Sequence, residues 1–124
     1  MKTMTIAEYH ATLKAQGTND RTKLCMICPM CGTVQCGDDL IVAGAGKTFD
    51  DIEKYLGFSC IGRWTHGKPP PCEKDKGKQI GCNWTLGGLF HTHTLEVVTP
   101  DGDHHPRFEV ATPDQATVHL SNRR

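Results

Sequence analysis

The chain carries the turn sequence Cys28-Pro29-Met30-Cys31-Gly32, and the rest of the architecture depends on it. Two thiolates separated by two residues can point at one ion, and the following glycine lets backbone amides turn toward the sulfurs. A closed structural zinc site is tetrahedral and needs four ligands. The turn therefore predicts half of a zinc site, and we expect the other two ligands further along the chain.

Cys60 and Cys82 are the residues that we expect to complete this site with Cys28 and Cys31. Cys60 ends an expected extended piece, and Cys82 stands just before Asn83-Trp84, whereas Cys72 lies in a proline-rich loop. We interpret the pattern as a zinc-ribbon-like site whose second half is split by an insertion. A metal clamp across this insertion would offset much of its loop-closure entropy. Ligand type alone does not separate zinc from iron.

Three further cysteines leave alternatives open. Cys25 stands three positions before Cys28, so these two could form the pair, and Cys31 could pair with Cys36. Cys25, Cys36 or Cys72 could each replace an expected ligand. The simplest alternative is that all seven cysteines are reduced thiols that fill a core or are incidental.

The composition favours metal ligands over disulfides. A chain of 124 residues fits one domain, here 1–124, and only 37% of its residues are hydrophobic, so its core must be thin. Seven cysteines cannot all pair within one chain. No stretch resembles a signal peptide or could cross a bilayer, so we expect a cytoplasmic protein. The cytoplasm is reducing, and we expect clustered thiols there to bind metal and not to form disulfides.

Local signals predict an α+β fold with two or three short helices. Thr5 and Glu8 form a capping box that begins an N-terminal helix within 1–17, which Gly17 ends. Further signals predict four more elements. These are a strand piece at Leu40-Ile41-Val42, a helix from Thr48 to Gly57, a β-hairpin of 93–99 and 106–110 around the turn at 100–103, and a last helix capped by Thr112.

The segment 62–81 is rich in proline and lysine, and we interpret it as an inserted loop. Trp64 and Trp84 flank this basic loop, which gives the stacking surface and positive charge that single-strand binders use. The candidate contacts to a nucleic acid or another partner are Trp64, Lys68, Lys74, Lys76 and Lys78. The formal net charge of zero weighs against a protein built to coat nucleic acid.

Four histidines lie near or on the two arms of the expected hairpin, namely His91, His93, His104 and His105. Residues two apart on a strand face the same way, so a second metal site is conceivable there, although polar strand-end histidines are the simpler interpretation. Cys60 with one of these histidines could form a nucleophile and base. A thiol-dependent or metal-dependent enzyme is therefore one alternative function.

Several longer blocks carry a family resemblance. They are Cys-Pro-Met-Cys-Gly-Thr-Val-Gln (28–35), Tyr-Leu-Gly-Phe-Ser-Cys (55–60) and Gly-Cys-Asn-Trp-Thr-Leu-Gly-Gly-Leu (81–89), with the Pro-Asp-Gly turn before His-Pro-Arg-Phe-Glu (105–109). With these blocks the sequence resembles a family of small, zinc-ribbon-like phage and prophage proteins. The resemblance supports Cys28, Cys31, Cys60 and Cys82, which fall inside the blocks. It implies phage origin, hence the cytoplasm of a bacterial host cell, and gives no activity.

We therefore expect a non-enzymatic interaction module in which zinc is scaffolding. Its partner would be a host or phage macromolecule, a protein before a nucleic acid, in host defence or nucleic-acid processing. The surfaces that we expect to matter are the loop 62–81 and an acidic face with Asp50, Asp51 and Glu53, because complementary charge steers association. A nucleic-acid-binding zinc ribbon is the second hypothesis.

Overall fold

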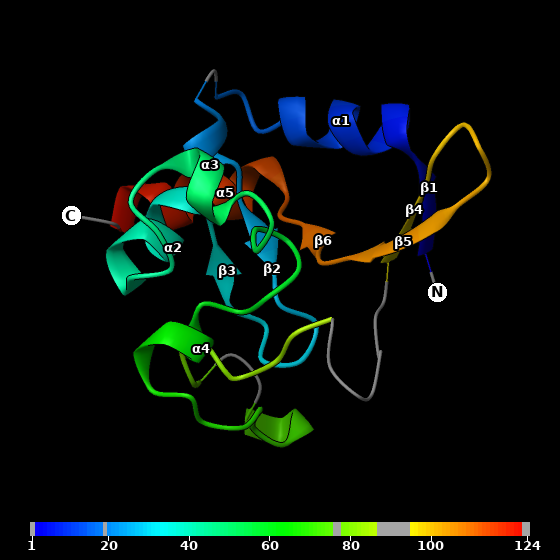
Figure 1. Ribbon diagram of the computed structural model, residues 1–124. Helices are drawn as coiled ribbons and strands as arrows, with labels where there is room; N and C mark the ends of the chain where they lie inside the picture. Colours follow the sequence, from blue (N-terminus) through cyan, green and yellow to red (C-terminus); the bar gives the residue numbers. More distant parts are fainter. Residues whose placement is uncertain (1, 19, 76–77, 87–94, 123–124) are drawn as a thin grey trace.

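A computed structural model describes residues 2–18, 20–75, 78–86 and 95–122, which form an α+β fold with two small sheets. The expected α+β class is confirmed. The first sheet has the order β1 (Lys2–Thr5), β4 (Leu95–Val98), β5 (His104–Arg107), and the second β3 (Val34–Gln35), β2 (Met26–Ile27), β6 (Glu109–Val110). The two sheets lie side by side, and the short helices gather around the second one (Figure 1).

The expected C-terminal hairpin is confirmed. Strands β4 and β5 are antiparallel, with Leu95 opposite Arg107, and the Thr99 amide donates to the Asp103 carbonyl across the turn at 3.0 Å. Residues 93 and 94, at the start of the expected strand, lie outside the described residues. Strand β1 was not expected. It pairs in parallel with β4 on the side away from β5, with Lys2 beside Leu95.

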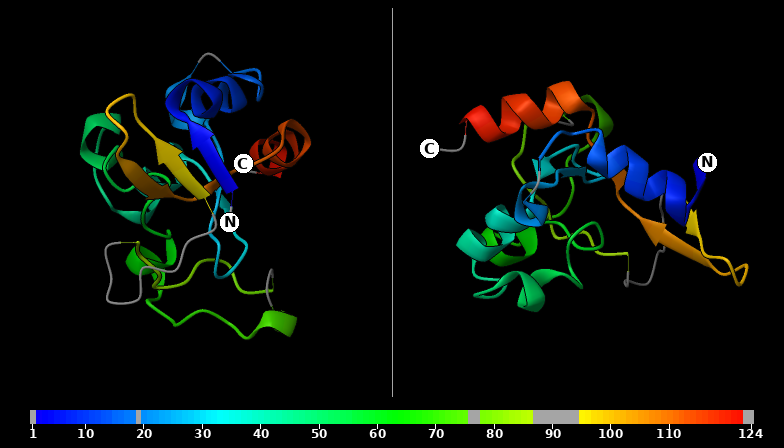
Figure 2. Two further views of the ribbon diagram at one scale, coloured as in Figure 1. Left: turned by 90° about the vertical axis from the view of Figure 1, so that its right-hand side faces the viewer. Right: turned by 90° about the horizontal axis from the view of Figure 1, so that it is seen from above.

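The first and last helices begin as the capping signals predict. In α1 (Ile6–Lys14) the Thr5 hydroxyl accepts from the Glu8 amide at 3.1 Å, and the Glu8 carboxylate accepts from the Thr5 amide at 3.0 Å. Thr112 and Gln115 make the same exchange ahead of α5 (Pro113–Asn122). Figure 2 shows that α1 and α5 flank the second sheet, while α1 also continues directly from β1.

The expected strand at Leu40-Ile41-Val42 is wrong, because this segment belongs to α2 (Gly37–Ala43). The Asp39 carboxylate accepts from the Cys36 amide at 2.9 Å and starts the helix, and Gly44 ends it at φ +98°, where glycine is favoured. Leu40 is buried, whereas Val42 is 81% exposed. The apolar side chains of this segment therefore do not form one buried strand face. The hydrogen bonds at the two ends of the segment favour a helix.

The remaining helices are single turns. The helix expected from Thr48 to Gly57 is shorter, since α3 covers Phe49–Ile52 and the chain then continues in turns. The loop 62–81 contains α4 (Gly62–Thr65) and the 3-10 helix η2 (Glu73–Asp75), and a further 3-10 helix, η1 (Arg21–Lys23), precedes β2. No helix within the described ranges is both long and apolar enough to span a membrane.

The main core is built around sulfur. Its fully or nearly buried members are Met26, Cys28, Cys31, Cys60, Cys82, Leu86 and Phe108. Tyr9 and Leu13 of α1 pack against this cluster, which explains how a helix without a fully buried residue is held in place. Four of the seven core side chains are cysteines, so contacts among their sulfurs make up much of this core.

Candidate metal centre

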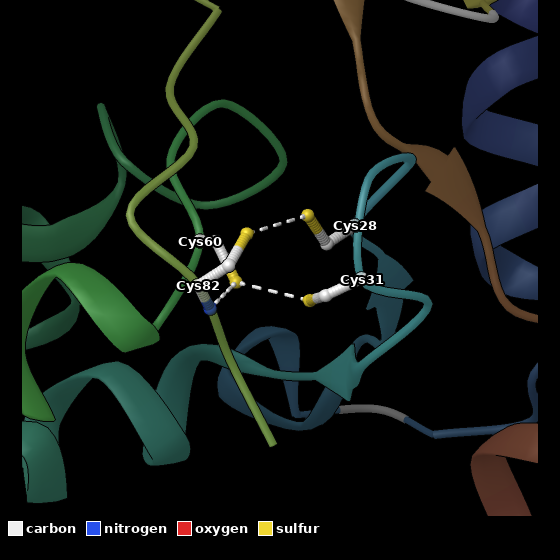
Figure 3. Close-up of side chains that lie close together, drawn as sticks. All are labelled: Cys28, Cys31, Cys60 and Cys82. Atoms are coloured by element: carbon white, nitrogen blue, oxygen red, sulfur yellow. Dashed lines mark hydrogen bonds between the residues drawn. The ribbon is translucent and has the colours of Figure 1, made fainter. Parts of the chain in front are cut away.

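The structure brings Cys28, Cys31, Cys60 and Cys82 together. Figure 3 shows the pair from the turn after β2 facing the pair from the two segments that flank the loop 62–81. Cys28 Sγ lies 3.7 Å from Cys82 Sγ, and Cys31 Sγ lies 3.7 Å from Cys60 Sγ. All four sulfurs lie within 4.8 Å of one another, and none of the four side chains is exposed.

The first pair is set by the connection between β2 and β3. The Cys28 amide donates to the Thr33 carbonyl at 3.1 Å, and the Gly32 amide donates to the Cys28 carbonyl at 2.9 Å. Gly32 has φ +75°, a left-handed conformation that glycine adopts without a Cβ clash. The turn therefore aims both thiols at the same point, as the Cys-x-x-Cys-Gly spacing predicts.

The second pair is set by two segments that run side by side. The Cys60 amide donates to the Trp84 carbonyl and the Leu86 amide to the Phe58 carbonyl, both at 2.9 Å. A Cβ atom added to Gly62 would lie 2.1 Å from the Cys82 amide nitrogen. Glycine at position 62 is thus what lets the two cysteine-bearing segments touch.

The four sulfurs fit a tetrahedral ion. Sulfurs placed tetrahedrally at a Zn–S distance of about 2.3 Å lie about 3.8 Å apart, which agrees with the two distances of 3.7 Å. Thiolates select zinc, iron and copper(I) over hard cations such as Mg²⁺. The cluster could therefore hold a metal ion.

Polar groups around the cluster contact the sulfurs directly. The Gln35 side-chain amide donates to Cys60 Sγ at 3.5 Å, and its carbonyl oxygen accepts from the Ile61 amide at 2.8 Å. The Cys82 amide donates to the same sulfur at 3.3 Å. The Thr33 hydroxyl lies 3.1 Å from Cys31 Sγ. N–H donors of this kind orient metal ligands and stabilise their negative charge.

The thiols also perturb one another. Hydrogen bonding to Cys28 lowers the pKa of Cys31, and it lowers the pKa of Cys60 to about 6, whereas hydrogen bonding to Cys31 raises the pKa of Cys28. A thiolate is the form that binds metal, so lowered pKa values at Cys31 and Cys60 favour ion binding.

The other three cysteines lie elsewhere. Cys72 is exposed in the loop, where its thiol contacts the Asp75 carboxylate at 3.1 Å. Cys25 and Cys36 are buried in a separate cluster with Ala111 and Ala116. The structure thus brings neither of the alternative pairs, Cys25 with Cys28 nor Cys31 with Cys36, to the four-sulfur cluster.

The expected contact residues of the loop are only partly available. The Trp64 ring packs against Tyr55, with ring centroids 4.8 Å apart, and is half-buried. Lys68, Lys74 and Lys78 are exposed, and Lys78 lies 3.4 Å from the Asp75 carboxylate. Lys76 lies outside the described residues.

The expected acidic face is similarly engaged. Asp50 lies 3.6 Å from the Arg21 guanidinium, and Asp51 accepts hydrogen bonds from the amides of Lys47 and Thr48 at the start of α3. Glu53 is exposed. The Asp51 carboxylate thus has a structural task at the helix start.

The histidines of the hairpin do not form a described site. His104 contacts the Glu96 carboxylate at 2.8 Å, and His105 lies opposite Val97 in the ladder. His91 and His93 lie outside the described residues.

Sequence reasoning missed a group on another face of the structure. Donor atoms of Cys36, Asp39 and His119 lie within 4.8 Å of one another. His119 stands 80 positions after Asp39, and their side chains meet at 2.6 Å. The available signal was the position of Cys25, three residues before Cys28, and of Cys36, five residues after Cys31, just outside the two strands that this turn connects.

Comparison with known proteins gives one match. The model of the VVA0879-like family matches residues 5–111, a span that includes all four clustered cysteines. No curated protein and no solved structure matches the chain.

Proposed function

The chain belongs to the VVA0879-like family, and on this premise we propose that it is a non-enzymatic interaction module held together by zinc. The observation that carries the proposal is the complete burial of Cys28, Cys31, Cys60 and Cys82. A catalytic zinc keeps one position open for water or substrate, whereas a structural zinc is closed by four protein ligands. The closed site supports a role for zinc in folding, and the proposed function then lies in partner binding at the protein surface.

A protein partner is supported by an apolar groove along α5. The groove has a volume of about 410 Å³ and is lined by Val34, Asp114, Gln115, Val118 and His119. A neighbouring hollow shares Val34 and His119 with this groove and is bordered by Ile80. Ile80 is 78% exposed and Val118 is 60% exposed. Large exposed apolar side chains beside a groove are typical of protein-binding surfaces.

The resemblance to phage and prophage proteins gives the proposal its setting. In an infected or lysogenic bacterium the partner is a host or phage macromolecule, and we propose a component of host defence or of nucleic-acid processing. Binding such a component would modulate its activity without chemistry by this chain.

The experiment is crosslinked capture from infected cells with matched variants. Ile80→Asp and Val118→Asp place a charge beside the groove, and Val42→Asp places one at an equally exposed residue that does not line the groove. We expect one specific partner to be lost from both groove variants and kept by the Val42 variant. Capture that is identical in all three proteins would contradict the groove as the contact surface.

Elemental analysis tests the metal. Zinc bound to Cys28, Cys31, Cys60 and Cys82 is expected, and iron in its place would correct the ion while leaving the ligands. A folded protein with no transition metal would contradict the proposal.

Nucleic-acid binding is the second candidate, because Lys68, Lys74 and Lys78 are exposed on one loop. Binding to single- or double-stranded DNA that weakens steeply with salt would support it. The absence of binding at low salt would remove it.

A further inference from the structure

Cysteines flank strands β2 and β3 and belong to two separate clusters. In their antiparallel ladder Met26 lies opposite Gln35 and Ile27 opposite Val34, so the next positions outward are Cys25 and Cys36. Side chains alternate between the faces of a strand. Met26 belongs to the core of the four-cysteine site, whereas Cys25 and Cys36 share a second buried cluster with Ala111 and Ala116.

The second cluster is bordered by a histidine and a carboxylate. A ring nitrogen of His119 on α5, a carboxylate oxygen of Asp39 on α2 and the Cys36 sulfur all lie within 4.8 Å of one another. The Cys25 thiol lies in the same buried cluster as Cys36 and donates to the Lys23 carbonyl at 3.5 Å. One sulfur, one nitrogen and one oxygen therefore converge from the start of α2 and from α5.

We propose that Cys36, Asp39 and His119 form a second Zn²⁺ site that is separate from the four-cysteine site. Thiolate, imidazole and carboxylate are the three ligand types of protein zinc, and three of them leave the fourth tetrahedral position to water. The Asp39 carboxylate accepts from the Cys36 amide and pairs with His119, but neither contact requires a buried thiol beside the same two side chains.

The site has an approach from solvent. The side chains of Asp39 and His119 are 12% and 23% exposed, whereas Cys25 and Cys36 are fully buried. His119 also lines the groove along α5. An ion can therefore enter from the groove side and be held from below by sulfur. Once bound, it would tie α5 to the β2–β3 pair and to the start of α2.

Metal counting tests the proposal. Protein purified with Zn²⁺ under reducing conditions should contain two zinc ions per chain, and the double variant Cys36→Ser/His119→Ala should contain one. The matched control is Cys72→Ser/His10→Ala, which changes an exposed thiol and an exposed imidazole and should keep both ions. One zinc ion per chain in the unmodified protein would overturn the second site.

A milder variant covers the case in which loss of buried Cys36 prevents folding. His119→Ala removes a ligand from a partly exposed position, and Co²⁺ reports on each bound ion through its absorption bands. We expect the second Co²⁺ equivalent to bind about tenfold or more weakly and its bands to change, while the first equivalent is unaffected. Unchanged binding of the second Co²⁺ would overturn the assignment of His119. A Cys25–Cys36 disulfide, found by peptide mass spectrometry in the reduced and zinc-loaded protein, would overturn the site as a whole.

Discussion

The two faces of the β2–β3 pair hold sulfur in two different settings. On one face Cys28 and Cys31 meet Cys60 and Cys82 in a closed cluster at the centre of the main core. On the other, Cys25 and Cys36 lie beneath Asp39 and His119 at the edge of a groove. The first arrangement fills part of the main core together with apolar residues such as Leu86 and Phe108, and the second lies where a helix meets solvent. Strand alternation alone is enough to assign these different tasks to neighbouring cysteines.

Removal of metal should have the largest effect of all the changes, and it should act mainly on the four-cysteine face. Structural zinc contributes about 10–16 kcal/mol of apparent binding free energy in small zinc domains, which is as much as the whole stability of an ordinary domain. We therefore expect a chelator under reducing conditions to abolish the cooperative thermal transition and the near-ultraviolet circular dichroism. The Cys72→Ser variant should behave like the unmodified protein. A metal-free chain that still melts cooperatively would show that the four-cysteine face does not depend on an ion.

Gly62→Ala should destabilise the four-cysteine face without removing a cysteine. The new Cβ would lie 2.1 Å from the Cys82 amide nitrogen and 2.6 Å from the Cys82 carbonyl oxygen, so the backbone must move. We expect a loss of about 3 kcal/mol in the free energy of unfolding, measured by urea denaturation of the zinc-loaded protein.

The matched control for that variant is Gly67→Ala. Position 67 has no atom within 4 Å of an added Cβ but a φ of +66°, so its cost is conformational and should be about 1 kcal/mol. Equal losses at the two positions would mean that the contact between the Cys60 and Cys82 segments is not critical.

Gln35→Ala should destabilise the four-cysteine face by removing a side chain that hydrogen-bonds to it. It removes the acceptor of the Ile61 amide and a donor to Cys60 Sγ, and the side chain is only 1% exposed. We expect a loss of about 2 kcal/mol in stability and about tenfold in metal affinity, measured by competition with a chromogenic chelator. Gln79→Ala, which removes bonds to two loop carbonyls, should leave metal affinity unchanged. A change in affinity of the same size in both variants would contradict a specific role for Gln35.

Thr112→Ala should affect only the face that carries Cys25 and Cys36, and its effect should be the smallest of the four. It removes the acceptor of the Gln115 amide at the start of α5, at a cost of about 1 kcal/mol. Hydrogen exchange should become faster in α5 and stay slow around Cys28 and Cys60. Thr117→Ala, in the exposed middle of the helix, is the control. Faster exchange on both faces would mean that the two clusters form one cooperative unit.

Local signals allowed part of this structure to be predicted from the sequence. The capping boxes at Thr5 and Thr112 and the hairpin turn at 100–103 each lie within a few residues, and the structure has all three. At Leu40-Ile41-Val42 the apolar run indicated a strand, but a cap from Asp39 and a stop at Gly44 made a helix. Residue type was a weaker signal there than the bonds at the helix ends.

Features that depend on distant segments were not predictable in the same way. The convergence of Cys28 and Cys31 with Cys60 and Cys82 was expected from the ligand number of zinc, and the geometry agrees. No residue spacing in the sequence predicts the approach of His119 to Asp39, because this contact depends on how α5 packs against β3. The parallel pairing of β1 with β4 could not be predicted from a local signal either, since no turn links the two strands.

That parallel pairing sets an order of events during synthesis. Leu95 follows its partner Lys2 by 93 positions, and at about 5–20 residues per second the ribosome needs roughly 5–19 s to add them. All four cysteines of the four-cysteine cluster are made within this interval, so they can meet before β1 has a strand to join. Strand β1 is thus made well before the strand with which it pairs.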